Sequence, residues 1–454
     1  MAEPLSPARR FLYALGNPGF QITDRIVVLV AVYFYLPPPG RGLDAQVPEH
    51  TYFGFVTIFG VAMLAGRIVD TLADPVVGYL SDRSRSRLGR RRVMLMLGLA
   101  PMVAFPVLLF FPPYAPGSIG NGVWVAGLLV VYFVAFTAYV APYFALIPEV
   151  AWDQAARLRL SQTMQLASLP IIGAFSAWGV GLDAGRAAGL SATTSVRLFV
   201  IGASLLALAL ALGPILAVDE SRHTRATRSE LPFFAALWTT LRYRPFLIYL
   251  TGQIFFVMGV NLLQPVFPYL ATVVLGRSEG FTLYFLASTG AGIGLGFLLQ
   301  RPLVARHGPK RVLIGSIALA SLAMSALGLL EPAPPGAPGD AFNLVVCIGA
   351  LGLFGIPAAA LMVLPHVVVS QLIDADAKRT GSSRAAMFFG VQGLLTKWVY
   401  GLSTWCFTFL LASYGNSAQE PWGVVLVGPV AGALCLLSLG FYAFYPERAV
   451  LEAR

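Results

Sequence analysis

Long runs of apolar residues, each ended by proline, glycine or charge, recur along the whole chain and constrain its fold most. Twelve runs can be separated, and each approaches the roughly 20 residues that a helix needs to cross a bilayer. Only 11% of the residues are charged, whereas an average soluble domain is about one quarter charged. So few charges cannot cover a water-soluble surface, and the pattern therefore predicts an all-α polytopic membrane protein with twelve transmembrane helices.

The expected helices divide into two sets of six. They are predicted near 18–37, 52–80, 93–111, 123–147, 160–182, 197–218, 246–274, 282–304, 312–330, 342–372, 385–411 and 422–445. The predicted parts are an N-terminal six-helix bundle at 1–218, a basic central loop at 219–245 and a C-terminal six-helix bundle at 246–454. The segments 82–91 and 306–311 both combine glycine with basic residues after the second helix of a set, which indicates two related halves.

Basic residues gather in every second loop. They include Arg83, Arg85, Arg87, Arg90, Arg91 and Arg92 after the second run, Arg306, Lys310 and Arg311 after the eighth, and Lys378, Arg379 and Arg384 after the tenth. Cytoplasmic loops carry such an excess, so both termini are expected in the cytoplasm. The net charge of +10 is spread over these short loops. We therefore expect a lipid bilayer and no nucleic acid as the macromolecular surroundings.

Charged residues inside the second run form the strongest candidate site. Arg67, Asp70 and Asp74 are three or four residues apart and share one helix face. Two carboxylates one turn apart repel each other, which favours a bound small cation or a shared proton. Alternatively, Arg67 neutralises Asp70 as a packing pair, although one arginine cannot balance two acids. Pro75 removes one backbone hydrogen bond and is expected to expose a carbonyl nearby.

Other charges in or beside the runs leave more than one interpretation open. Lys397 lies mid-run in a chain with only three lysines, and it is expected to contact substrate, to couple to the acids, or else to snorkel to the interface. Asp24 and Arg25 form either a cavity-facing site or a structural pair, and His366 either titrates or is a satisfied buried histidine. Asp82 and the arginines after it are expected to form a cytoplasmic gate. Glu149, Asp153, Arg157 and Arg159 are predicted to be surface loop charges.

Enzyme chemistry has no support in the sequence. It contains no nucleophile–base set, metal-ligand spacing or phosphate-binding glycine loop. The apolar stretch 290–296 is rich in glycine and is expected to permit close helix packing. We therefore expect no enzyme activity and no cofactor. Two sets of six helices joined by a basic loop are the layout of a transporter, whose energy would come from an ion gradient or from the substrate's own gradient.

At this point the residues resemble a known family. The motif Asp70-x-x-x-Asp74-Pro75-x-x-Gly78-x-x-x-Asp82-Arg83 is similar to that of the glycoside–pentoside–hexuronide:cation symporters of the major facilitator superfamily. Further matching segments are Pro142-Tyr143-x-Ala145-Leu146-x-Pro148-Glu149, Thr380-Gly381 with Arg384, and Lys397. The resemblance implies the major facilitator fold and symport coupled to Na⁺, Li⁺ or H⁺. It implies cation binding by Asp70, Asp74 and Thr137, with the only metal ion a possible Na⁺, and a gate at Asp82, Arg83 and Arg384.

The substrate positions depart from that family. The melibiose carrier binds sugar with two aspartates and an arginine, and the matching positions here are Phe20, Val140 and Gln165. If the alignment with the family has a gap near Gly19, Asp24 instead matches the first of the two sugar-binding aspartates. Candidate substrate or coupling residues are Lys397, Asp24, Arg67, Gln165 and Tyr143.

The expected function is cation-coupled symport of a small organic solute by alternating access, with a sugar or sugar derivative as the leading substrate class. Alternatives are a lysolipid-type transporter with an apolar cavity, and a non-transporting sensor on a carrier scaffold. The resemblance implies a bacterial inner-membrane protein, and we expect it to work as a monomer.

Overall fold

The chain is helical throughout the part that the structure describes. The computed structural model describes residues 5–84, 86, 88–151, 154–176, 178–220, 242–380 and 385–447, and no β-strand occurs among them. The chain separates into two compact units, Met1–Ser229 and Glu230–Arg454. The predicted central loop at 219–245 falls across this division, and 221–241 lie outside the described residues. The predicted all-α membrane fold is confirmed.

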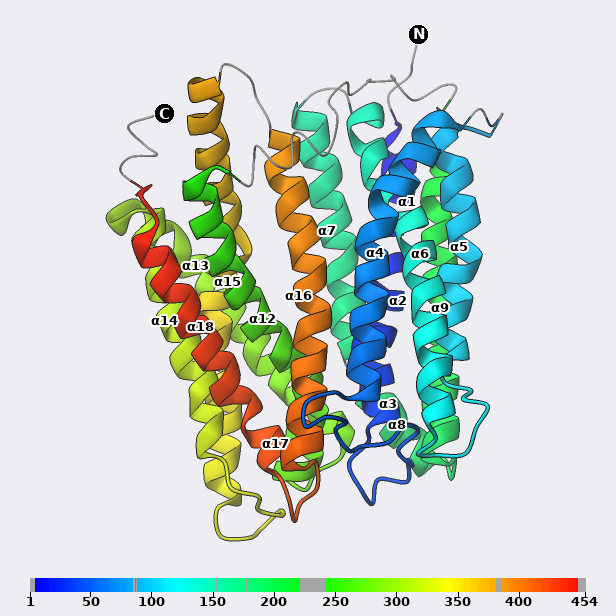
Figure 1. Cartoon of the computed structure of the whole chain (residues 1–454), viewed down its shortest axis with the longest axis vertical. Helices are drawn as coiled ribbons and strands as arrows, with labels where there is room; N and C mark the ends of the chain where they lie inside the picture. Colours follow the sequence, from blue (N-terminus) through cyan, green and yellow to red (C-terminus); the bar gives the residue numbers. More distant parts are fainter. Residues whose placement is uncertain are drawn as a thin grey trace. The chain divides into compact units, whose positions relative to one another are not determined.

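The described part of the first unit forms six helical passes, which Figure 1 shows in colours from blue to green. Its elements are α1 (Pro7–Ala14), α2 (Gly16–Arg25), the π-helix η1 (Ile26–Val30), α3 (Ala31–Tyr35), α4 (Ile58–Arg83), α5 (Arg90–Leu108), α6 (Ile119–Val150), α7 (Gln154–Ser176), α8 (Trp178–Ala187) and α9 (Ala192–Ala217). The first pass begins at Pro7 rather than at residue 18, because Ser6 accepts a bond from the Arg9 N–H and caps it. The second begins six residues later than expected, since Tyr52 and Val56 pair in a turn.

The described part of the second unit also forms six passes. Its elements are α12 (Arg244–Tyr269), the π-helix η2 (Leu270–Val274), the 3₁₀ turn η3 (Glu279–Phe281), α13 (Thr282–His307), α14 (Pro309–Ala326), the 3₁₀ turn η4 (Leu327–Leu329), α15 (Asp340–Thr380), α16 (Ala385–Tyr414), α17 (Trp422–Val425) and α18 (Val427–Phe444). The expected runs and these passes agree in number and order.

Two local features recur in both units and support the predicted repeat. A single π-helical turn ends or interrupts the first pass of each unit, at Ile26–Val30 and at Leu270–Val274. A glycine with positive φ also precedes the third pass of each, Gly89 at 104° and Gly308 at 78°. A side chain at such φ is strained, so glycine is required at the same structural position twice.

Eight described helices are long and apolar enough to cross a membrane by length and composition. They cover Arg90–Leu108, Ile119–Ile147, Ala192–Ala217, Arg244–Val274, Glu279–His307, Pro309–Leu329, Asp340–Arg379 and Trp422–Phe444. Large apolar side chains are exposed along them, for example Leu205 at 61% and Leu298 at 75%. Such exposure is unfavourable in water and favourable in lipid. Helix α4 is not among the eight because Arg67, Asp70 and Asp74 lie within it.

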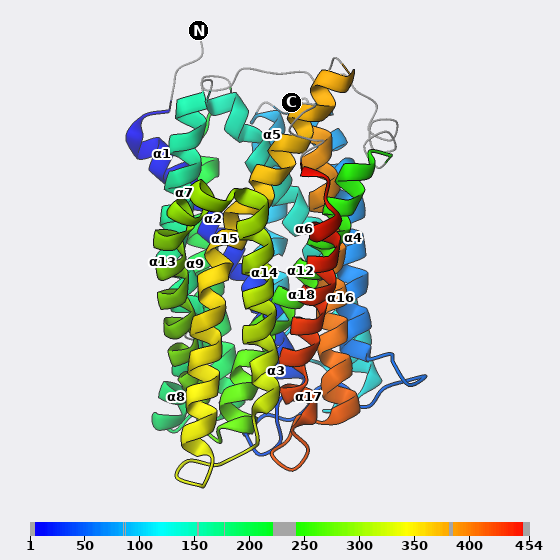
Figure 2. The same cartoon turned by 90° about the vertical axis from the view of Figure 1, so that its left-hand side faces the viewer.

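Glycines permit close helix contacts within each unit. In the first, a Cβ on Gly66 of α4 would lie 2.7 Å from the Phe133 ring of α6. In the second, a Cβ on Gly292 or Gly296 of α13 would lie 2.1 or 2.2 Å from a carbonyl oxygen of α15, and Figure 2 shows these two helices side by side. The close packing predicted for 290–296 is therefore confirmed at these two positions.

Candidate functional site

Three helices of the first unit bring charged and polar side chains together around Arg67. The Arg67 guanidinium lies 2.8 Å from a carboxylate oxygen of Asp24 on α2 and 3.5 Å from one of Asp70 on α4. It also stacks over the Phe133 ring of α6, 4.4 Å from the ring centre. Arg67 is 3% exposed, so these contacts replace its water almost completely.

Thr137 of α6 completes the cluster from the other side. Its hydroxyl donates a hydrogen bond of 2.5 Å to the second carboxylate oxygen of Asp70. Asp70 is completely buried and Thr137 is 1% exposed. Only the family resemblance indicates Thr137 as a site residue, because its position in the sequence does not predict a contact with Asp70. The structure places the two side chains in direct contact.

Two carboxylates lie within ion-pair distance of Arg67, those of Asp24 and Asp70. Asp74 follows one turn beyond Asp70 on the same helix and is half-buried. Pro75 lies inside α4 and leaves the carbonyl of Thr71 without its intrahelical donor. Carboxylate, hydroxyl and carbonyl oxygens are the ligands that hard cations prefer. This end of the cluster therefore supplies the chemistry that a small cation needs.

The π-helix η1 is a feature of the site that the sequence did not reveal. It begins at Ile26, directly after Asp24 and Arg25. Single π turns often mark functional positions, because they rotate the following residues relative to an α-helix. The apolar run Ile26–Val30 is equally compatible with an α-helix, so no local signal predicts it.

The remaining predicted substrate residues are dispersed over both units. Lys397 is half-buried near the middle of α16 in the second unit. Gln165 is exposed on α7. Tyr143 is completely buried and stacks on Tyr13 with ring centres 4.8 Å apart. The hydroxyl of each tyrosine donates a hydrogen bond to the backbone carbonyl of the other. In the structure Tyr143 packs between α1 and α6, and no part of its side chain is exposed.

The predicted gate falls largely outside what the structure describes. Arg384 is not among the described residues, and Asp82 and Arg83 are described only as the backbone end of α4. The side chain of His366 is likewise outside the description. The gate residues therefore remain a prediction.

Glu149 is a correction to the sequence interpretation. Instead of lying on a surface loop, it is 1% exposed at the end of α6. Its carboxylate lies 2.7 Å from the Arg90 guanidinium and 2.8 Å from that of Arg91. Helix α6 extends three residues further than the predicted 147, and this extension carries Glu149 to the start of α5. Arg159, from the same predicted group, is exposed as expected.

Glu220 also contacts the start of α5, through the backbone of the residues there. Its carboxylate accepts hydrogen bonds of 3.0, 2.8 and 2.6 Å from the backbone N–H groups of Arg90, Arg91 and Arg92. These are the unpaired donors at the N-terminus of α5, where a negative charge is stabilised. The chain after α9 is thereby tied to the basic connection between α4 and α5.

Comparisons with known proteins agree with this architecture. The family model described as "MFS/sugar transport protein" matches residues 12–446. A symporter from Synechocystis (sll1374) is 30% identical over 168 residues, which cover 35% of this chain and 28% of that protein. A Bacillus subtilis symporter (YnaJ) is 24% identical over 88% of both chains. A sodium-dependent lysophosphatidylcholine symporter from Xenopus tropicalis is 23% identical over 97% of this chain and 87% of that one.

Solved structures add evidence on the fold alone. A bacterial homologue of the human lysosomal transporter Spinster, in an inward-facing state, superposes with a TM-score of 0.69 at 14% identity and covers 99% of each chain. The match to the family model extends over nearly the whole chain, and the Bacillus subtilis symporter aligns over 88% of both chains. The chain therefore belongs to the MFS/sugar transport protein family and, within the major facilitator superfamily, to the glycoside–pentoside–hexuronide:cation symporters, which are membrane transporters.

Proposed function

We propose that this protein is a cation-coupled symporter whose coupling cation binds between Asp70, Asp74 and Thr137. The observation that carries the proposal is the completely buried carboxylate of Asp70, which Thr137 holds at 2.5 Å. A buried charge is costly, and in a membrane helix it marks an ion or substrate pathway by default. The relatives named as symporters support coupling to a cation.

Arg67 gives the cluster a second arrangement for its charges. It contacts Asp24 at 2.8 Å and Asp70 at the longer distance of 3.5 Å. A cation that enters beside Asp70 and Asp74 takes over the neutralisation of Asp70, and Arg67 then pairs with Asp24 alone. Cation binding would thus change the ion pairing between Arg67 and α2, the helix that continues into the π turn.

For the solute we propose a sugar or sugar derivative, as the family match supports. Asp24, half-buried on α2, is the group that would accept hydrogen bonds from its hydroxyls. Lys397 on α16 would bind the solute or couple it to the cation. We further propose location in a bacterial inner membrane with both termini cytoplasmic.

A specific observation favours a lysolipid-like solute as the second candidate. Phe20 on α2 packs against Phe136, Tyr143 and Phe144 of α6 with ring centres 5.8 Å apart. Phe144 remains 44% exposed while the other three rings are buried, so an apolar ring rather than a charged group is accessible at this position. A full-length relative is named a sodium-dependent lysophosphatidylcholine symporter.

A two-ligand thermal-shift screen of the purified protein distinguishes these solutes. Glycosides, acidic sugars and lysophospholipids are each added with Na⁺ or with choline at fixed pH. The proposal predicts stabilisation that requires both solute and cation, by the linkage between binding and unfolding. If a solute stabilises the protein equally in choline, the same comparison is made between pH 5 and pH 8. Stabilisation independent of both Na⁺ and pH contradicts cation coupling.

A further inference from the structure

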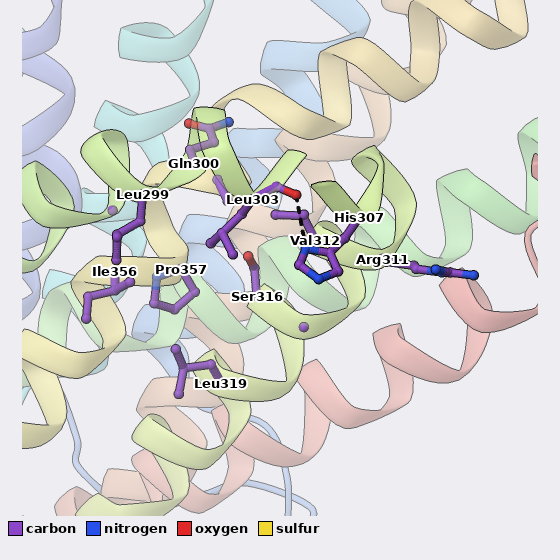
Figure 3. A pocket seen from close by; sticks show the side chains of 13 residues that line it. Leu299, Gln300, Leu303, His307, Arg311, Val312, Ser316, Leu319, Ile356 and Pro357 are labelled. Carbon is purple, nitrogen blue, oxygen red and sulfur yellow. Dashed lines mark hydrogen bonds between the residues drawn. The ribbon is translucent and has the colours of Figure 1, made fainter. Parts of the chain in front are cut away.

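A groove in the second unit lies between α13 and α14 and has α15 at its base. Its volume is about 340 Å³, within the range of about 300–1,000 Å³ found for small-molecule sites. Its lining is mostly aliphatic and includes Leu299, Leu303, Leu319, Ile356 and Pro357 (Figure 3). Leu299 and Leu303 are 40% and 42% exposed, so the groove is open along the outside of the unit.

Small residues on α14 keep the groove open. A Cβ built on Gly315 meets no atom within 4 Å, and Ser316 follows it in the lining. On the opposite wall, Gly296 packs directly against α15. Helices α13 and α14 both pack extensively on α15 but contact each other little, which leaves the groove between them.

One end of the groove is basic. His307 and Arg311, at the connection between α13 and α14, line it there, and Figure 3 shows both side chains at the end opposite Leu299 and Ile356. Arg301 and Arg306 of α13 are exposed beside the lining residues. Within the described part of the chain, Arg301, Arg306 and Arg311 form no ion pair with an acidic side chain.

We propose that this groove binds an anionic phospholipid of the adjacent leaflet. One acyl chain fills the aliphatic part, and Arg311 and His307 hold the headgroup phosphate. Charge complementarity selects this occupant, because basic pockets between transmembrane helices bind anionic headgroups. An apolar helix from a second protein would leave the basic end of the groove without a counter-charge.

The location gives the lipid a structural role. It would span the gap between α13 and α14 and cover the part of α15 that contains Pro357. A proline inside a helix removes a backbone hydrogen bond and weakens it locally. The lipid would therefore stabilise the second unit beside this proline.

Photo-crosslinking tests the site in the membrane. The full chain is reconstituted in phosphatidylcholine vesicles that contain either diazirine-acyl phosphatidylglycerol or diazirine-acyl phosphatidylcholine, and labelled peptides are mapped. The proposal predicts at least fivefold more phosphatidylglycerol than phosphatidylcholine on peptides covering 296–319. Arg311→Gln should lower this labelling about fivefold, the effect of one basic residue near an anionic headgroup.

Gly315→Leu provides an independent test because it fills part of the groove without removing a charge. The open space around Gly315 accepts the new side chain, and labelling of 296–319 by both lipids should fall at least threefold. Gly349→Leu is the matched control, since Gly349 is an exposed helical glycine of α15 with no atom near its Cβ. Its labelling should match the wild type. Equal labelling by the two lipids, or unchanged labelling in Arg311→Gln and Gly315→Leu, would overturn the proposal.

Discussion

A single buried arginine organises the candidate site at the scale of residues. Arg67 contacts Asp24 and Asp70 with its charge and Phe133 with its planar face. The three-to-four-residue spacing predicted Arg67, Asp70 and Asp74 on one face of α4. Asp24 and Thr137 join them only through the packing of α2 and α6, which depends on contacts between distant parts of the sequence.

The hydroxyl of Thr137 should matter for cation affinity. Thr137→Val keeps the shape of the side chain and removes the hydrogen bond to Asp70. Hydrogen bonds to charged groups contribute about 1.5–3 kcal/mol, so the cation concentration for half-maximal uptake should rise at least about tenfold. Thr289→Val is the control, because the Thr289 hydroxyl bonds only within its own helix, to the Phe285 carbonyl. Equal cation dependence in the two variants would refute this role.

The ion pair between Asp24 and Arg67 should contribute to stability. Asp24→Asn leaves a buried guanidinium with one fewer counter-charge, and the Asp24 side chain is 32% exposed. Because Asp24 is partly exposed, loss of this ion pair should lower the free energy of unfolding by only about 1–2 kcal/mol. Thermal unfolding in detergent measures this loss. Asp44→Asn, at an exposed loop position, should leave the melting temperature unchanged, and an equal effect of both changes would argue against the pair.

At the scale of elements, the helices could be predicted more completely than their ends. Every apolar run corresponds to a helical pass, because a run of that length has no other way to satisfy its backbone in lipid. The ends differ where polar side chains supply a cap or a partner, as Ser6 does for α1 and Glu220 for α5. Glu149 was misplaced for the same reason, since its partners lie about sixty residues away at Arg90 and Arg91.

The N-terminus of α5 should be sensitive to its preceding glycine. Gly89 has φ of 104°, and a Cβ there would lie 2.6 Å from a carboxylate oxygen of Glu220. Gly89→Ala should therefore lower stability by about 1–3 kcal/mol through backbone strain and displacement of that carboxylate. Gly127→Ala on the exposed face of α6 should instead be neutral or stabilising, because it restricts the unfolded chain. Comparable melting temperatures for Gly89→Ala and Gly127→Ala would contradict the expected backbone strain at position 89.

At the scale of the whole molecule, each unit repeats the same plan. The recurrence of a π turn and of a positive-φ glycine at matching positions indicates two related bundles. Composition sufficed to predict the membrane, and the apolar runs predicted the helices and their order. The solute could not be predicted, because it depends on a few side chains whose surroundings come from helix packing.

The predicted orientation can be measured with single cysteines. Leu88 lies in the connection between α4 and α5, and Ala115 lies in the connection between α5 and α6. In a variant whose native cysteines are replaced by alanine, a membrane-impermeant maleimide should label Ala115→Cys in intact cells. It should label Leu88→Cys only after the membrane is opened. Labelling of Leu88→Cys in intact cells would reverse the orientation.

Accumulation of solute in proteoliposomes tests the central claim most directly. The solute found by the thermal-shift screen is supplied outside, with an inward gradient of Na⁺ at equal pH or of H⁺ without Na⁺. With one of these gradients, the wild type should concentrate the solute above its external level. Asp70→Asn and Asp74→Asn, reconstituted in equal amounts and monodisperse before reconstitution, should show no accumulation with either gradient. Accumulation by these variants at the wild-type level would contradict a coupling cation at the Asp70 cluster.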